Sequence, residues 1–523
     1  MNIAIIGGGV SGLSTAFYLR KKFPDAERNP ITVFESADEV GGNANTFKVR
    51  LPKKGVPGDV VERWVDMGVN DFNLGTYKAL VDLWEELGFM KQGNPCPTAP
   101  DYCRPLINSE SFATGDSRYR YTIDETGFVS APPGSTALND IPDLRRDIER
   151  FKKELGRWYE TYKPEGKNPI TVEGWIRSSN MPFSEAFIYN NLYPRINGMY
   201  FTVEDPQTGR KIPPADMPLW MVAHYYILQE AYGQTPVSPC VRQYFVDGSR
   251  KWLIDFAKIL ESPKYNVTVA RKVPKLSFFK KPENKISIHA VGSEVGLYDK
   301  VIFATHANDN AAMLNTDDFR NDEIYKALSK FKYEKCDILV HQDATFLGPN
   351  DFGCTYNIHI YDYNKENKGK YPYNISYIVN KHQNDAANPN PDRRTDPEFY
   401  LTINPYWNSG VIPTEKVLKL WDNPTWSAGM QMSHCKLDQN AMDGQLIILD
   451  EQLMKKVERT YYFGGSFAKG AGLHVECIIQ AKDIAEKIFD KNYQPTEIYD
   501  FTGKREYFAP KYILDAISSI NNK

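Results

Sequence analysis

The sequence predicts a protein of the α/β class, and two distant parts of the chain support this. Near the start, an apolar run at residues 2–6 meets a glycine cluster at 7–12, a segment of helical spacing at 13–20 and a second apolar run at 31–35. Near the end, an apolar run at residues 461–465 precedes a helix predicted from about residue 473 to residue 489. Strands and helices that alternate in this way are typical of a parallel sheet covered by helices.

The glycine cluster that follows the first apolar run has the spacing of a dinucleotide-binding turn. We expect Gly7 to allow a sharp turn, Gly9 to let a pyrophosphate approach the backbone, and Gly12 to let the helix pack closely. N–H groups at the helix start, around Ser11, would then meet the phosphates. Glu35 lies 23 residues beyond Gly12 and could accept hydrogen bonds from ribose hydroxyls. The alternative is a tight turn in an α/β protein that binds no ligand.

Between these ends, helical and extended segments alternate along the chain. Residues 53–58 form a turn-rich break, and helices are predicted over residues 71–88 and 141–162. Residues 170–233 look mainly helical and aromatic, and residues 382–397 look like an exposed loop. Further strands are predicted at residues 266–269, 285–289, 300–304, 337–341, 374–379 and 399–403.

The composition is that of a globular protein from a reducing compartment. The 523-residue chain is 41% hydrophobic and 25% charged with a net charge of −3, so nothing favours nucleic acid as a partner. The 7 cysteines form no Cys-x-x-Cys pair and the 8 histidines show no metal-type spacing, so no metal is predicted. No apolar stretch approaches the ~20 residues that span a bilayer, and a first strand beginning at Asn2 leaves no room for a signal peptide. We therefore expect a cytoplasmic protein with a small-molecule substrate; no feature indicates its oligomeric state.

Four segments resemble motifs of the flavin-containing amine oxidase superfamily, which also includes phytoene-desaturase-like and protoporphyrinogen-oxidase-like enzymes. They are Val40-Gly41-Gly42, Asp66-Met67-Gly68, the segment from Tyr298 to His306, and the closing segment from Phe463 to Ile488. The closer likeness is to bacterial NAD/FAD-binding proteins associated with fatty-acyl modification.

This resemblance implies an α/β, amine-oxidase-like fold in two discontinuous parts. The FAD-binding Rossmann-like domain would combine residues 1–50, 240–310 and 455–495. The α+β substrate domain would combine residues 51–239 and 311–454, and residues 496–523 would form a C-terminal tail.

The resemblance also implies FAD as the cofactor and assigns residues to its parts. Those implied around the adenosine and diphosphate are Gly7, Gly9, Gly12, Glu35, Gly41 and Gly42. Val273 would offer its backbone to the adenine, Gly465 would lie near the ribityl chain, and His474 near the pyrimidine edge of the flavin. For His474, the alternative is that its backbone N–H meets the flavin rather than its imidazole. The FAD could be noncovalent or attached through Cys435.

Two residues are implied in the chemistry by the same resemblance. Lys335 corresponds to a lysine that holds a water near flavin N5, with a surface lysine as the alternative. His434 corresponds to a histidine that could line the substrate cavity, with a core histidine as the alternative. Leu473 stands where many amine oxidases carry a tyrosine, which weakens the case for a simple primary amine. Aromatic residues that would roof the substrate, or else belong to the core, are Tyr200, Trp220, His224, Tyr225 and Tyr226.

Together these features imply an FAD-dependent oxidoreductase of the oxidase or desaturase type. It would transfer hydride from a C–H bond of a largely apolar or amine-bearing small molecule, lipid-like ones included, to flavin N5. One alternative is a redox-neutral FAD-dependent isomerase that moves a double bond in an unsaturated fatty acyl chain. The other is a non-catalytic FAD-binding protein.

Overall fold

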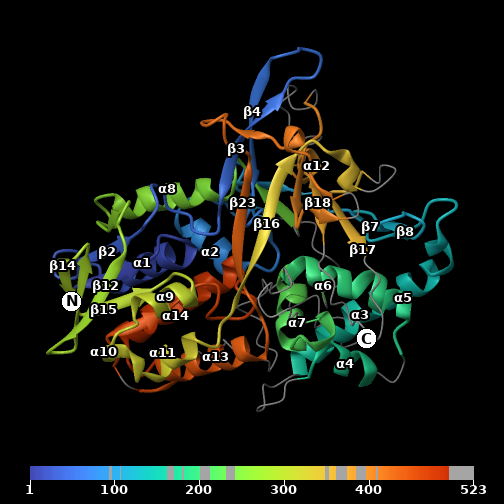
Figure 1. The fold of residues 1–523 in the computed structure, drawn as a ribbon. Coiled ribbons are helices and arrows are strands. Elements are labelled where there is room, and N and C mark those ends of the chain that lie inside the picture. Colours follow the sequence, from blue (N-terminus) through green and yellow to red (C-terminus); the bar gives the residue numbers. More distant parts are fainter. Residues whose placement is uncertain are drawn as a thin grey trace.

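The computed structural model describes residues 1–493 except for residues 94–96, 107, 162–169, 179–181, 201–212, 231, 233–241, 348–352, 361–373, 384–395, 408–409 and 457. The tail predicted at residues 496–523 lies outside the described residues, as do the Tyr200 side chain and most of the loop predicted at residues 382–397. Two halves lie side by side, each built on its own sheet (Figure 1). We call them the parallel-sheet half and the mixed-sheet half.

The parallel-sheet half is built on a five-stranded parallel sheet with the order β11-β2-β1-β15-β24. Its strands are β1 (Ile3–Ile6), β2 (Ile31–Phe34), β11 (Thr268–Ala270), β15 (Lys300–Phe303) and β24 (Tyr461–Phe463). Every residue of β1, β15 and β24 is buried, and apart from Lys300 at the start of β15 these strands are continuous apolar or aromatic runs rather than alternating ones. All five strands come from the three segments that the sequence predicts to share one domain.

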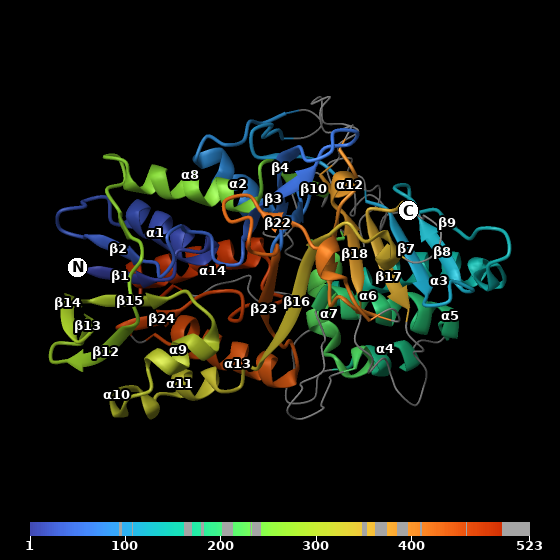
Figure 2. The same ribbon diagram turned by 45° about the horizontal axis from the view of Figure 1, so that its top comes forward.

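Three long helices pack around this sheet (Figures 1 and 2): α1 (Val10–Lys22), α8 (Ser249–Glu261) and α14 (His474–Phe489). α1 contacts both α8 and α14, and it is therefore buried along its whole length from Val10 to Arg20. A small antiparallel sheet leads from β11 to β15 and consists of β12 (Leu276–Lys281), β13 (Lys285–Ala290) and β14 (Ser293–Tyr298).

α2 (Lys78–Glu86) packs on α14 and is shorter than the helix predicted at residues 71–88. Asp71–Asn73 instead form strand β5, and the Asn73 side-chain oxygen then accepts the Gly75 N–H at 2.9 Å. This local bond turns the chain before the helix can begin. β5 pairs with β10 (Arg242–Phe245), which also pairs with β6 (Cys103–Pro105).

The mixed-sheet half is built on an eight-stranded sheet with the order β23-β16-β19-β18-β17-β7-β8-β9. Its strands are β23 (Gly429–Cys435), β16 (Tyr333–His341), β19 (Tyr400–Ile403), β18 (Ile375–Ile378), β17 (Tyr356–Ile360), β7 (Glu110–Thr114), β8 (Arg120–Ile123) and β9 (Val129–Ser130). All neighbours are antiparallel except β17 and β7. Helices gather below this sheet in Figure 1: α3 (Ile141–Thr161), α4 (Val172–Ser178), α5 (Glu185–Phe187), α6 (Tyr193–Tyr200) and α7 (Leu219–Leu228).

The remaining elements are one long hairpin and several short helices. A hairpin of β3 (Thr46–Pro52) and β4 (Val60–Asp66) extends away from the body of the molecule and pairs with β22 (Lys419–Leu420) (Figure 1). Shorter helices on the lower side are α9 (Ala307–Met313), α10 (Asp317–Arg320), α11 (Glu323–Leu328) and α13 (Gln439–Leu449), while α12 (Val379–His382) follows β18. Among the described residues, no helix combines the length and apolar character needed to cross a bilayer.

α13 lies with the parallel-sheet half, although the sequence places residues 311–454 in the other part. The Gln445 side chain donates to the carbonyls of Phe467 and Gly470, each at 3.0 Å. The Gln452 side chain bonds both the carbonyl and the N–H of Phe463 at 2.9 Å. These buried amides tie residues 439–454 to the closing segment, so the boundary between the halves falls earlier than residue 455.

Candidate functional site

The two ends of the chain meet at the carboxyl edge of the parallel sheet. A side-chain carbon placed on Gly7 would lie 2.7 Å from the Ala304 carbonyl oxygen, and one on Gly464 would lie 2.9 Å from the Ser11 hydroxyl oxygen. The turns that follow β1, β15 and β24 are thus in contact. Ligands of open α/β sheets bind at this edge, so we expect a ligand beside these turns, where the sequence predicts a cofactor, and we call this region the crevice.

The three glycines of the first turn differ in what a side chain would meet. Gly7 has a φ of +108°, and a Cβ on Gly12 would lie 1.9 Å from the Gly7 carbonyl oxygen, so both are needed by the fold itself. A Cβ on Gly9 would meet nothing closer than Gly42 Cα at 3.7 Å. The fold itself therefore does not require a glycine at this position, in keeping with the expected approach of a ligand.

The second glycine pair lies directly against the first turn. The Gly41 N–H donates to the Gly8 carbonyl at 3.1 Å, and a Cβ on Gly42 would be 3.3 Å from Gly9 Cα. Gly41 and Gly42 have φ values of +142° and +57°, which favour glycine. The two turns form a shared backbone surface without side chains, which we call the glycine cradle (Gly9, Gly41 and Gly42).

Glu35 and Val273 lie beside this cradle, at the ends of neighbouring strands. The Glu35 carboxylate accepts the N–H groups of Gly8 and Ala37, each at 2.8 Å. The Val273 N–H donates to the Glu35 carbonyl at 2.9 Å. The carboxylate keeps lone pairs that could accept from a ribose, whereas Val273 could offer an adenine only its carbonyl oxygen without breaking this bond.

The closing turn, residues 464–474, lies against the first glycine turn and completes this region. Gly465 has a φ of +119°, and its N–H donates to the Gln480 side chain at 2.9 Å. The Glu476 carboxylate accepts the Leu473 N–H at 3.0 Å and contacts the His224 imidazole at 2.9 Å. The buried Gln480 and Glu476 side chains therefore hold the turn that precedes α14.

His474 begins α14 with its imidazole packed among aromatic rings. The ring centres of Trp252 and Phe245 lie 6.0 and 6.2 Å away. Burial lowers the pKa of His474 to about 4, so the imidazole is neutral at physiological pH. Its Nδ1 is buried without a hydrogen-bond partner among the described residues.

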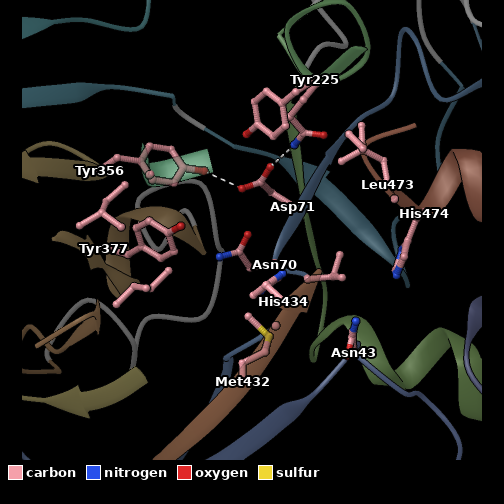
Figure 3. A pocket seen from close by; sticks show the side chains of 18 of the residues that line it. Asn43, Asn70, Asp71, Tyr225, Tyr356, Tyr377, Met432, His434, Leu473 and His474 are labelled. Atoms are coloured by element: carbon pink, nitrogen blue, oxygen red, sulfur yellow. Dashed lines mark hydrogen bonds between the residues drawn. The ribbon is translucent and has the colours of Figure 1, made fainter. Parts of the chain in front are cut away.

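A cavity of ≈ 240 Å³ opens between the closing turn and the mixed sheet (Figure 3). Leu473 and His474 line it on one side, and Tyr356 and Tyr377 on the other. The sheet contributes an apolar wall that consists of Ile358, Ile375, Leu401, Ile403 and Met432.

Asp71 is the centre of a polar cluster in this cavity (Figure 3). Its carboxylate pairs with Arg242 at 2.9 Å, accepts the Tyr356 hydroxyl at 2.7 Å and contacts His382 at 3.3 Å. Burial opposes ionisation, but Arg242 and His382 outweigh it and lower the Asp71 pKa to about 2. Arg242 also pairs with Glu230 at 3.0 Å. Asp71 is therefore a fixed anion that can only accept hydrogen bonds.

The predicted catalytic residues have different positions. His434 lies on β23 and lines the cavity, and burial together with His306 lowers its pKa to about 3. Lys335 is exposed on β16 and does not line the cavity. Its neighbour Cys336 is buried, and successive strand residues face opposite sides. This position favours the alternative of a surface lysine, and a role of Lys335 near FAD stays an untested prediction.

Of the aromatic residues predicted to cover the substrate, some line the cavity and others belong to the core. Tyr225 lines the cavity, whereas Trp220 and Tyr226 are buried in the core and do not line it. His224 is 1% exposed and lies between Tyr159 and Glu476. Cys435 lines the cavity, and burial raises its thiol pKa. Within the described ranges, no group of three or more His, Cys, Asp or Glu side chains could hold a metal ion.

Sequence reasoning missed the polar cluster. Asp71 and Asn70 follow the Asp66-x-Gly68 motif closely, which is a signal that could have been used. Arg242 and Tyr356 lie on β10 and β17, which are buried strands. The sequences of these two strands contain no motif that points to a polar cluster. Their meeting at Asp71 depends on the topology of both halves.

Comparison with known proteins agrees with this architecture. Residues 5–87 match the family model of the NAD(P)-binding Rossmann-like domain. No protein of curated function matches the sequence.

Solved structures that resemble the chain extend over nearly its whole length. A variant of putrescine oxidase has a TM-score of 0.54 at 15% identity, covering 93% of this chain and 98% of that one. An Exiguobacterium sp. protein provisionally assigned as a protoporphyrinogen oxidase has a TM-score of 0.53 at 12% identity, covering 93% and 98%. An oxidoreductase from Methanosarcina mazei has a TM-score of 0.52 at 13% identity, covering 93% and 99%. The predicted two-part α/β fold is thus confirmed: this chain shares it with the putrescine oxidase variant and the two other solved structures, and its residues 5–87 match an NAD(P)-binding Rossmann-like domain.

Proposed function

We propose that this protein is an oxidoreductase that binds FAD at the carboxyl edge of its parallel sheet and oxidises a small molecule in the adjoining cavity. The observation that carries this proposal is the meeting of the chain ends, which brings the glycine cradle, the closing turn and the cavity together. The folds of the oxidases and the oxidoreductase named above support it. When bound, FAD supplies a hydride acceptor at N5.

The residues at the crevice fit such a group. The Ser11 hydroxyl at the first turn and His474 Nδ1 at the closing turn are both buried without partners among the described residues. A hydroxyl can donate and accept, and so can a neutral imidazole. A diphosphate at one end and the polar edge of a flavin at the other would satisfy them. A Cβ on Gly9 would clash with no protein atom, so the fold itself does not require a glycine there, which fits the close approach of a diphosphate to the backbone.

The cavity suits a substrate with an apolar body and one polar group. The isoleucine and leucine side chains of the mixed sheet would pack against the body. Asp71, held as an anion by Arg242, would accept a hydrogen bond from the polar group. His434 has a pKa near 3 and is a weak base at neutral pH, so its proposed role is to orient the substrate rather than to remove a proton.

Purification and denaturation test the cofactor assignment. We expect a yellow protein that releases FAD into the supernatant after acid precipitation. Colour that stays in the pellet would indicate a covalent link, for which Cys435 is the candidate. A colourless protein that does not take up added FAD would contradict the proposal.

Anaerobic addition of candidate substrates tests the reaction. Bleaching of the flavin absorbance by an apolar alcohol, amine or acyl compound, with recovery on addition of an oxidant, is the expected result. A product formed without consumption of any oxidant would instead identify the redox-neutral isomerase. FAD that is bound but never reduced by any compound would favour the non-catalytic alternative.

A further inference from the structure

We propose that Arg250, on the first turn of α8, is the cation that binds the cofactor diphosphate at the glycine cradle. The inference rests on the proposed FAD site and adds a residue that the glycine motifs do not include. A diphosphate carries negative charge, and the helix dipole of α1 contributes only ~0.3–1 kcal/mol toward it. A positive side chain at the cradle would supply a much stronger interaction.

Arg250 lies against the cradle. A Cβ placed on Gly41 would come within 3.1 Å of both Cγ and Nε of Arg250. Gly41 is therefore needed where the arginine side chain passes. A Cβ on Gly42, the next residue, would be 3.3 Å from Gly9 Cα. Arg250 therefore contacts one end of the glycine cradle, at Gly41, while Gly9 forms the other end.

Hydrogen bonds hold both the backbone and the guanidinium group of Arg250. Its backbone N–H donates to the Thr46 hydroxyl at 3.1 Å, next to Ser249, whose N–H donates to the buried Asp66 carboxylate at 2.9 and 3.0 Å. The guanidinium Nε donates to the Ala44 carbonyl at 3.2 Å, and Nη2 donates to the Asn45 side-chain oxygen. These bonds use two of the five guanidinium donors. The other three are available to a ligand from a fixed position.

The positive charge of Arg250 has no paired carboxylate in the described part of the chain. Asp66, Glu39 and Glu35 act on it only at longer range, and burial, the largest effect, lowers its pKa. The arginines of the cavity differ, because Arg242 pairs with two carboxylates and Arg195 pairs with Glu110. A half-buried guanidinium without a counter-ion is costly unless an anion compensates it. The cradle beside it is where a diphosphate is expected.

The test compares ligands with and without a diphosphate. Full-length protein freed of flavin is titrated with FAD, and with ADP and adenosine as competitors, for the wild type and Arg250→Gln. Hydrogen bonds to charged groups imply a loss of about 10- to 100-fold in the affinity for FAD and ADP. Adenosine affinity should not change. Arg250→Lys keeps the charge without the fork and should give an intermediate loss.

Lys251→Gln provides the matched control, since it removes one positive charge from the next position of α8, where Lys251 pairs weakly with Asp247 at 3.4 Å. It should bind FAD like the wild type. FAD affinity within twofold of the wild type in Arg250→Gln would overturn the inference while leaving the proposed function intact. Equal losses for adenosine and ADP would also overturn it. A wild type that binds no FAD would overturn the proposed function and this inference together.

Discussion

The crevice is formed mainly by backbone atoms, whereas the cavity is formed mainly by side chains. Backbone forms most of the crevice: Gly9, Gly41 and Gly42 carry no side chains, and Gly465 takes a φ of +119°. The cavity is formed by side chains, with Asp71, Arg242 and Tyr356 arriving from three separate strands. A surface made of backbone can bind the same group in proteins of very different sequence, whereas one made of side chains changes with each substitution. We therefore expect cofactor binding to depend on a few local positions and substrate choice on distant ones.

Gly12→Ala should have the largest effect. The new Cβ would lie 1.9 Å from the Gly7 carbonyl oxygen, and neither this backbone oxygen nor a Cβ bonded directly to the helix backbone can turn away. We expect a loss of more than about 4 kcal/mol in the free energy of unfolding, or no folded protein. Urea unfolding monitored by circular dichroism measures it. Wild-type stability would show that α1 can move away from β1.

Asp71→Asn should have the next largest effect, this time in the cavity. The amide would still contact Tyr356, but Arg242 would lose one of its two carboxylate partners. We expect about 3 kcal/mol lower stability with FAD still bound, since Asp71 is not part of the crevice. Urea unfolding and the flavin content of the purified variant are the two measurements. Loss of flavin would contradict the separation of crevice and cavity.

Acidification should destabilise the protein, because both regions bury neutral histidines. The pKa values of His434, His474 and His341 are lowered to about 3, 4 and 4, while unfolded histidine titrates near ~6.5. Their contribution is present above ~6.5 and is lost as the pH falls. Asp66 works in the opposite direction, because burial raises its pKa to about 7.

At pH ~5.5 these four groups together bind roughly two more protons in the unfolded chain than in the folded one, which contributes a slope of about 2.7 kcal/mol per pH unit. Urea midpoints between pH 7 and 5 measure this slope. His474→Gln should reduce it by about one proton. A flat profile would show that these imidazoles are protonated in the folded protein.

Gly9→Val sharpens the comparison within the first turn. Gly9 has a φ of −79°, which valine can adopt, and a Cβ there meets no protein atom closer than 3.7 Å. We expect nearly unchanged stability of the flavin-free protein and a loss of more than tenfold in FAD affinity, because the side chain occupies the space beside the cradle. Unchanged FAD affinity would remove Gly9 from the site.

Lys335→Met should have the smallest effect. The side chain is exposed and lies outside the cavity, so stability should change by less than about 0.5 kcal/mol. The rate of anaerobic flavin reduction should equal that of the wild type, measured by stopped-flow absorbance. Slower reduction would restore the catalytic role first inferred for Lys335.

The difference between the two regions also explains what the sequence could predict. The roles of Gly7 and Gly12 depend on a strand and a helix that are adjacent in the chain, so their spacing is visible. The closing segment is recognisable for the same reason, since Gly465 and His474 lie within one turn and helix. These local patterns lead to the fold class, which the structure confirms. The contacts of the individual residues with FAD stay predictions.

The cavity could not be predicted in this way. Lys335 shows why: a strand assignment does not tell which face a residue occupies, and a shift of one position exchanges the two faces. The ion cluster around Asp71 combines segments from both halves. The hydrophobic periodicity of one segment does not indicate which other segments it will contact. The end of the predicted helix at residues 71–88 was right, but the Asn73 turn that places Asp71 on a strand was missed.

The position of β24 at the edge of the parallel sheet has a consequence for biosynthesis. The ribosome makes β1 and the first glycine turn early, but Gly465 and α14 follow only after the strands between them have been made. Until β24 is made, a nascent polypeptide therefore exposes the edge of β15. Phe303 on that edge is not yet paired with Phe463. The proposed cofactor site is therefore complete only after α14 has been made, and until then the exposed sheet edge favours aggregation.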